Sequence, residues 1–173
     1  MFESLTQNSI SNKKSLNWRA LSADLILIAL LSGPIAAPFL AQLGVFPFNF
    51  IAKIVYFMGG AVCPQPEMGL MVSPPHLMAV CMRCYGLLLA LLTTRLLYTQ
   101  NRGKAWYWLS QYRYRGATIA TILTCAYLGE MLAQGFQLWN YNNWVVSGFG
   151  YIAGLGIGLF IVPVLYRKSV LDR

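Results

Sequence analysis

Two cysteines and an arginine stand together in the segment AVCMRCYGLLLALL, residues 79–92, at the head of a long apolar run. Cys81 and Cys84 are three residues apart, so on a helix their thiols lie on one side. Such a pair can bind a metal ion, cycle between dithiol and disulfide, or pack as small apolar side chains. The spacing alone leaves these alternatives open.

Two further residues can join this pair. Cys63 precedes it in the connection between apolar segments, and His76 lies five residues before Cys81. Zinc accepts three cysteines and one histidine at short spacings. We therefore expect a structural metal site at Cys63, His76, Cys81 and Cys84, with zinc as the metal that this residue set would take, or a structural disulfide among the cysteines. Cys125, alone in a later apolar segment, is expected to pack in the core.

Charged residues within the apolar segments are the second chemical signal. Arg83 lies between the two cysteines, and Glu130 lies at a matching depth in a segment that runs the other way. Because an unpaired charge in lipid is costly, we expect these two residues to form an ion pair. Snorkelling of Arg83 to the outer headgroups is the alternative. Gln134, one turn from Glu130, could hydrogen-bond in the same intramembrane polar cluster.

The composition indicates the environment of these residues. Of 173 residues, 57% are hydrophobic and 10% are charged, against about a quarter charged in soluble domains. The chain is therefore expected to be an integral membrane protein, in contact with the lipid bilayer. Its net charge of +8 indicates membrane topology rather than binding of nucleic acid.

The apolar segments predict an all-α fold, a four-helix transmembrane bundle with a short interfacial or re-entrant helix between the first two spans. Each crossing needs roughly 20 apolar residues, and the expected spans are 22–43, 75–98, 117–138 and 144–166. Residues 46–62 are too short to cross easily and contain Lys53. Pro34 and Pro38 should kink the first span.

The basic residues predict the orientation. With four crossings, 11 of the 13 lie on one side, which makes that side cytoplasmic. The transmembrane domain is then 22–168, between cytoplasmic tails at 1–21 and 169–173. The cysteines face the outer side, a periplasm or a lumen, and we expect a plasma membrane or an internal membrane of the thylakoid type.

Small residues recur along the last span in near-regular four-residue steps. They are Ser147, Gly150, Gly154 and Gly158. A stripe of this kind lets another helix approach closely. We expect it to pack against the third span of the same chain rather than in a dimer.

Taken together, these motifs resemble the domain-of-unknown-function 2085 family of predicted membrane proteins. The matching residues are CPQPE (63–67), CMRCYG (81–86), Glu130, Gln134, Asn142 and Ser147-Gly148. The resemblance covers about residues 50–160. It implies that Asn142 joins the polar cluster, and it implies no reaction.

The outer part of the pattern departs from that family. Pro64 stands where the family has a histidine, Met68 where it has a basic residue, and Trp144 where an arginine is usual. Each change removes a ligand or a charge. The metal set that the resemblance implies therefore needs His76 as a substitute.

The function that the sequence favours is an accessory or assembly subunit of a membrane complex, with another integral membrane protein as its partner and no enzymatic activity. One histidine offers no hydrolytic triad. The alternative is an enzyme, a thiol–disulfide oxidoreductase that uses Cys81 and Cys84 with Cys63 as a shuttle.

Overall fold

The computed structural model describes residues 18–101, 105–138 and 140–166. Within these ranges the chain is almost entirely helical, as predicted. Its elements are α2 (Trp18–Gln42), α3 (Phe48–Val62), η1 (Pro66–Met68), β1 (Met71–Ser73), β2 (His76–Leu77), α4 (Met82–Asn101), η2 (Leu109–Tyr112), α5 (Arg113–Gly135) and α6 (Asn143–Tyr166). The two short strands form an antiparallel hairpin that the sequence did not predict.

Within the described part of the chain, three helical segments are long and apolar enough to cross a membrane, namely Ala20–Gln42, Leu109–Gly135 and Asn143–Tyr166. Helix α4 is long enough but less apolar, because it carries Arg83, Arg95 and three threonines. Helix α3 has 15 residues, which is about 22 Å at 1.5 Å per residue and short of the hydrocarbon layer. The short apolar helix expected before the second span is therefore present.

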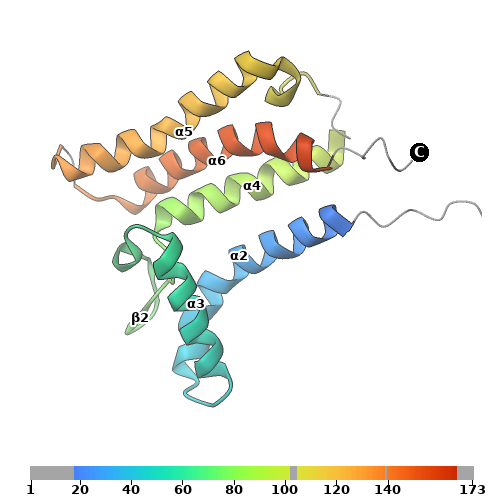
Figure 1. Ribbon diagram of the computed structural model, residues 1–173. Helices are drawn as coiled ribbons and strands as arrows, with labels where there is room; N and C mark the ends of the chain where they lie inside the picture. Colours follow the sequence, from blue (N-terminus) through green and yellow to red (C-terminus); the bar gives the residue numbers. More distant parts are fainter. Residues whose placement is uncertain (1–17, 102–104, 139, 167–173) are drawn as a thin grey trace, which may run out of the picture.

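Helix α6 lies between α4 and α5 and contacts both along its length (Figure 1). The first part of α2 runs beside α4. Its last part, which contains Pro34 and Pro38, turns away and pairs with α3 to form a hairpin that projects from beside the start of α4, away from α5 and α6 (Figure 1). Proline removes a helical hydrogen bond and clashes with the preceding turn, which explains the change of direction.

The small residues of α6 pack against α4, not against α5 as the sequence suggested. A Cβ at Gly150 would collide with the carbonyl oxygen of Arg83, and one at Gly158 would collide with the side chain of Thr94. Gly86 of α4 meets Ser147 in the same way. Packing within the chain is thus observed, but the partner differs because small residues on α4 complete the contact from its side.

The second predicted span begins later than expected. Pro74 and Pro75 form the turn between β1 and β2, and the helix starts only at Met82. Proline disfavours a helical conformation of the residue before it. In addition, backbone groups of β1 and β2 pair with each other and do not form helical hydrogen bonds. Arg83 therefore lies in the first turn of its helix.

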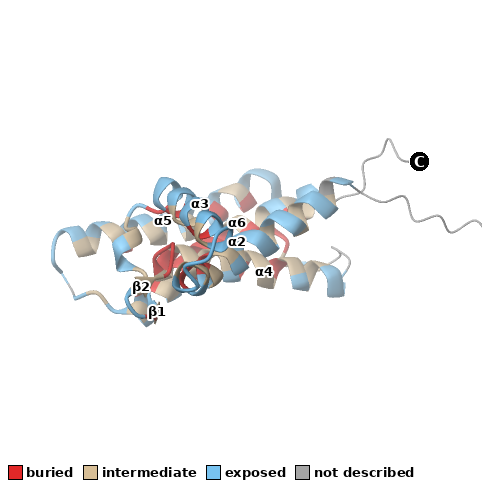
Figure 2. Cartoon of the chain, turned by 90° about the horizontal axis from the view of Figure 1, so that it is seen from below, coloured by how far each residue is buried: buried red, intermediate tan, exposed pale blue. Residues whose placement is uncertain are grey.

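Burial is concentrated where the helices meet, while the outward faces carry large apolar side chains (Figure 2). Phe46, Phe57 and Val62 are each about four-fifths exposed, at 81%, 79% and 81%. Cys125 is exposed on α5 rather than packed in the core as expected. A lipid solvent accepts such apolar side chains, so outward placement costs little.

A polar cluster that the sequence did not predict joins α2, α4 and α6 at the end away from the α3 hairpin. Arg95 donates from Nε and Nη2 to the two carboxylate oxygens of Asp24, both at 2.7 Å. The Tyr166 hydroxyl donates to Asp24 at 2.5 Å, and its ring centre lies 4.0 Å from the guanidinium carbon. This bidentate ion pair compensates the charge of Arg95, the second arginine of α4.

We predict that Gly150→Ala destabilises the protein in detergent by about 1–3 kcal/mol, because the added methyl group overlaps backbone that cannot move independently. Gly148→Ala is the matched control, since a Cβ there meets nothing within 4 Å. Thermal unfolding of both variants measures the difference. Equal melting temperatures would contradict the close packing of α4 and α6.

Candidate functional site

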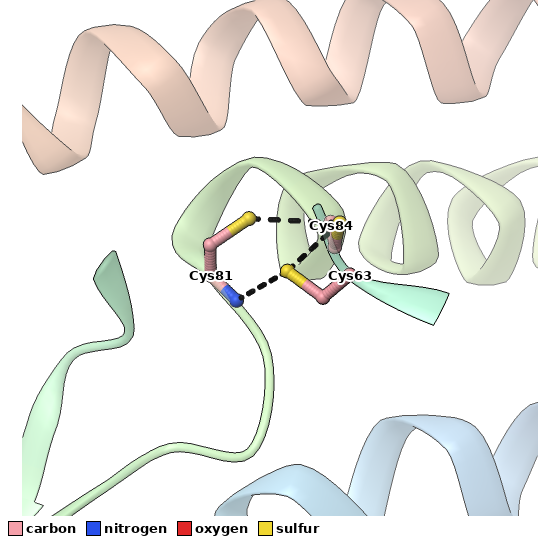
Figure 3. A group of neighbouring side chains, drawn as sticks. All are labelled: Cys63, Cys81 and Cys84. Carbon is pink, nitrogen blue, oxygen red and sulfur yellow. Dashed lines mark hydrogen bonds between the residues drawn. The ribbon is translucent and has the colours of Figure 1, made fainter. Parts of the chain in front are cut away.

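Three cysteines converge at the end of the bundle that carries the α3 hairpin (Figure 3). Cys63 is the C-cap of α3, and its backbone N–H donates to the Gly59 carbonyl at 2.8 Å. Cys81 immediately precedes α4, and its carbonyl accepts the first helical hydrogen bond, from Tyr85, at 3.1 Å. Cys84 lies in the first turn of α4, on the same side as Cys81.

The three sulfur atoms form a compact group. Cys84 Sγ lies 3.6 Å from Cys81 Sγ and 3.6 Å from Cys63 Sγ. All three lie within 4.8 Å of one another. A tetrahedral zinc ion with Zn–S bonds of about 2.3 Å holds its sulfurs about 3.8 Å apart. The three-cysteine group could therefore hold a metal ion.

Within this group the surroundings favour a thiolate at Cys63. Cys63 and Cys81 are 4% and 1% exposed, and Cys84 is half-buried. Hydrogen bonds from Cys81 and then Cys84 hold the pKa of the Cys63 thiol well below its usual range, and the backbone N–H of Cys81 contributes at 3.3 Å. The hydrogen bond with Cys63 acts in the opposite direction on Cys81 and raises the pKa of that thiol.

His76 is not part of this sulfur group. It lies in β2, where its backbone is in register with Ser73 of β1. The expectation that it supplies a fourth ligand depended on a helix that begins near residue 75. The extended chain between β2 and α4 separates His76 from the cysteines instead.

Arg83 and Glu130 form the ion pair that their charge and depth predicted. Arg83 Nε donates to Glu130 Oε2 at 2.5 Å, and both side chains are 0% exposed. Arg83 Nη2 donates to Gln134 Oε1 at 2.7 Å, and Nη1 donates to Gln65 Oε1 at 3.2 Å. Arg83 thus points into the protein and does not snorkel.

Two side chains join the cysteines to this ion pair. Gln65, bonded to Arg83, follows Cys63 by two residues. The Tyr127 hydroxyl lies 3.6 Å from Cys84 Sγ, and the ring centre of Tyr127 lies 5.5 Å from the guanidinium carbon of Arg83. The cysteine group and the ion pair are therefore parts of one site, built by α4, α5 and the chain after α3.

Asn142 has a different position from the one that the resemblance implied. It is exposed, and its side-chain oxygen accepts a hydrogen bond from the Trp144 backbone N–H at 3.0 Å. Asparagine is one of the preferred capping residues at a helix N-terminus. Asn142 therefore stabilises the start of α6, and none of the hydrogen bonds described for Arg83 involves it.

Sequence reasoning did not select Tyr127 or Gln65. A signal for Tyr127 exists, because Tyr127, Glu130 and Gln134 are spaced to lie on one face of a helix. Gln65 lies in an irregular connection, where no periodicity indicates which way its side chain points.

The DUF2085 family, described as predicted membrane proteins, matches residues 63–160. The chain belongs to the DUF2085 family. No curated protein and no solved structure matches it. The matched region begins at Cys63 and includes all residues of the site, whereas α2 and α3 lie before it. The site therefore lies wholly within the part of the chain that resembles the DUF2085 family, and the α2–α3 hairpin does not.

We predict that Arg83→Glu and Glu130→Arg each destabilise the protein by about 3–5 kcal/mol, because each leaves like charges buried together. The double exchange should recover part of this loss. Glu67→Arg is the control for introducing arginine, since Glu67 is exposed. The yield of monodisperse protein and its unfolding temperature report the effect. A double variant no more stable than either single variant would contradict the pairing.

Proposed function

We propose that Cys63, Cys81 and Cys84 hold one structural zinc ion, and that the protein is an accessory or assembly subunit of a membrane complex. The single observation that supports the zinc site is the convergence of three sulfurs from two separate elements, with two of their separations at 3.6 Å. Such distances suit shared coordination of one ion.

A metal ion here would join the end of α3 to the start of α4. Even without a metal ion these elements pack tightly. Gly59 lies so close to Ala79 that a Cβ at Gly59 would collide with the Ala79 carbonyl oxygen. The Ala79 backbone N–H also donates to the Pro34 carbonyl at 3.4 Å. The binding free energy of a structural ion would therefore help to hold the whole α2–α3 hairpin in place.

The proposed topology has four crossings, α2, α4, α5 and α6, with both termini cytoplasmic and the cysteines outside. The weak hydropathy of α4 does not argue against its crossing, because Arg83 and Arg95 are each paired with a carboxylate. Helix α6 also covers α4 along its length. Helix α3, with its exposed apolar side chains, would then lie at the outer interface.

The accessory role is supported by size and surface. The protein has a mass of 19.3 kDa, and most of its described surface carries apolar side chains of the kind that face lipid or another membrane helix. Another integral membrane protein is therefore the proposed partner. Its binding would need no soluble domain of this chain.

A second candidate function, thiol–disulfide oxidoreductase, is favoured by the position of the C-x2-C pair at the N-terminus of α4. Cys84 is equally distant from Cys81 and Cys63, so it could exchange a disulfide between them. Oxidation of two thiols would release two protons and pass two electrons to a disulfide or quinone acceptor. The two functions differ in whether metal or a reversible disulfide occupies the site.

We predict that protein purified anaerobically in detergent contains about one zinc ion per chain, and that Cys84→Ser loses it because Cys84 is central to the sulfur group. Elemental mass spectrometry measures the metal. Cys125→Ser is the matched control, since Cys125 is exposed on the outer face of α5.

The same samples decide between the two candidates. Free thiols are counted before and after a mild oxidant. Wild-type protein that holds no zinc and reversibly loses two thiols supports the oxidoreductase and excludes the structural metal. Zinc retained by wild type and by Cys125→Ser, but not by Cys84→Ser, supports the metal site.

We further predict that the C-terminus lies in the cytoplasm, because four crossings return the chain to its starting side. A reporter fused to the C-terminus should then be active only if it functions in the cytoplasm. Paired fusions to a fluorescent reporter that matures inside and to a phosphatase that folds outside test this. An active phosphatase would exclude the four-crossing topology.

A further inference from the structure

The geometry points to Tyr127 as the fourth ligand of the metal ion, through its phenolic oxygen. This inference rests on the proposed three-cysteine site and specifies its coordination as three sulfurs and one oxygen. It assigns a metal-binding role to a residue of α5, an element that contributes no cysteine to the group.

The spacing of the donor atoms supports this set. The Tyr127 oxygen lies 3.6 Å from Cys84 Sγ, the same separation as the two sulfur contacts of Cys84. With Zn–S bonds of about 2.3 Å and a Zn–O bond of about 2.1 Å, a tetrahedral ion holds sulfur and oxygen about 3.6 Å apart. Cys84 therefore has three neighbours at the distances expected within one coordination shell.

The histidine and carboxylate side chains of the described chain do not compete for this position. The group of such side chains and cysteines within ligand distance of one another contains only the three cysteines among the described residues. Glu130 is already paired with Arg83. Among the side chains of the described residues, the Tyr127 hydroxyl contacts a sulfur of the group.

A phenolate formed on metal binding would have a positive charge on each side. The guanidinium carbon of Arg83 lies 5.5 Å from the ring centre, so a buried positive charge faces the ring. A bound divalent cation would act in the same direction from the other side. Binding then exchanges the thiol protons and the phenolic proton for the metal ion, and these protons leave to solvent.

The consequence for the fold is a direct link between α5 and the cysteines. Through Tyr127 the ion would join α3, α4 and α5, and the same three segments are joined by Arg83 through Gln65, Glu130 and Gln134. Metal and guanidinium would thus hold the same elements at neighbouring positions.

The test titrates zinc into metal-free, reduced, full-length protein in detergent and records the near-ultraviolet difference spectrum, in which tyrosinate has a characteristic band. Wild-type protein should show one tyrosinate per zinc bound. Tyr127→Phe should bind zinc through the cysteines about tenfold or more weakly and show no tyrosinate band. Tyr151→Phe is the matched control, since that hydroxyl contacts Thr93 at 3.1 Å.

The outcomes separate this inference from the proposed function. Zinc binding by wild type without a tyrosinate band would overturn the role of Tyr127 and leave the three-cysteine site in place. Failure of wild type to bind zinc would overturn both. A band that persists in Tyr127→Phe would also refute the assignment, because another tyrosine would then be the ligand.

Discussion

A buried guanidinium holds together the end of this membrane protein that carries the cysteines. Arg83 has no exposed side-chain surface, and its nitrogens reach Glu130, Gln134 and Gln65. An uncompensated charge in such a place would cost several kcal/mol, so the elements that carry these partners must come together for the chain to fold. The positions of Cys81 and Cys84 follow from where the first turn of α4 is held.

Close helix packing makes this position possible. The Arg83 backbone lies against Gly150 of α6, and Gly86 of α4 lies against Ser147. Larger residues at either glycine would separate α4 from α6 and withdraw Arg83 from α5. Apolar helices gain little from burial when lipid is the solvent, so small residues and polar contacts supply the specificity.

Helix α4 carries a polar cluster near each end. Arg83 and Glu130 form the ion pair of the first cluster. Arg95 pairs with Asp24 in the second, where Tyr166 also bonds to Asp24. Between them, Ala90 and Thr94 pack in the interior. This explains why α4 is the least apolar of the long helices although it packs between α2 and α6. Its charges face protein partners, and the neighbouring helices carry the lipid-facing surface.

The cysteine group combines local and distant contributions. Cys81 and Cys84 are close because a helix begins between them, which places the second thiol one turn above the first. Cys63 reaches them only because the hairpin of α2 and α3 packs beside the start of α4 (Figures 1 and 3). A metal ion could therefore bind all three cysteines only when the hairpin and the bundle are correctly assembled, which fits a structural role.

The sequence by itself determined those features that follow from the cost of polar groups in lipid. Long apolar runs predicted the helices, and the pairing of Arg83 with Glu130 followed from opposite charges at matching depth. The short helix after the first span followed from its length. In each case one strong energetic term acts regardless of the neighbouring contacts.

Only the tertiary structure decided what depends on contacts between distant segments. The β1–β2 hairpin delays the start of α4 and removes His76 from the cysteines, whereas Tyr127 joins them from α5. The glycine stripe packs on α4 rather than α5, since complementary small residues lie on α4. Spacing along one helix shows which residues share a face, but the partner of that face depends on the packing of the whole bundle.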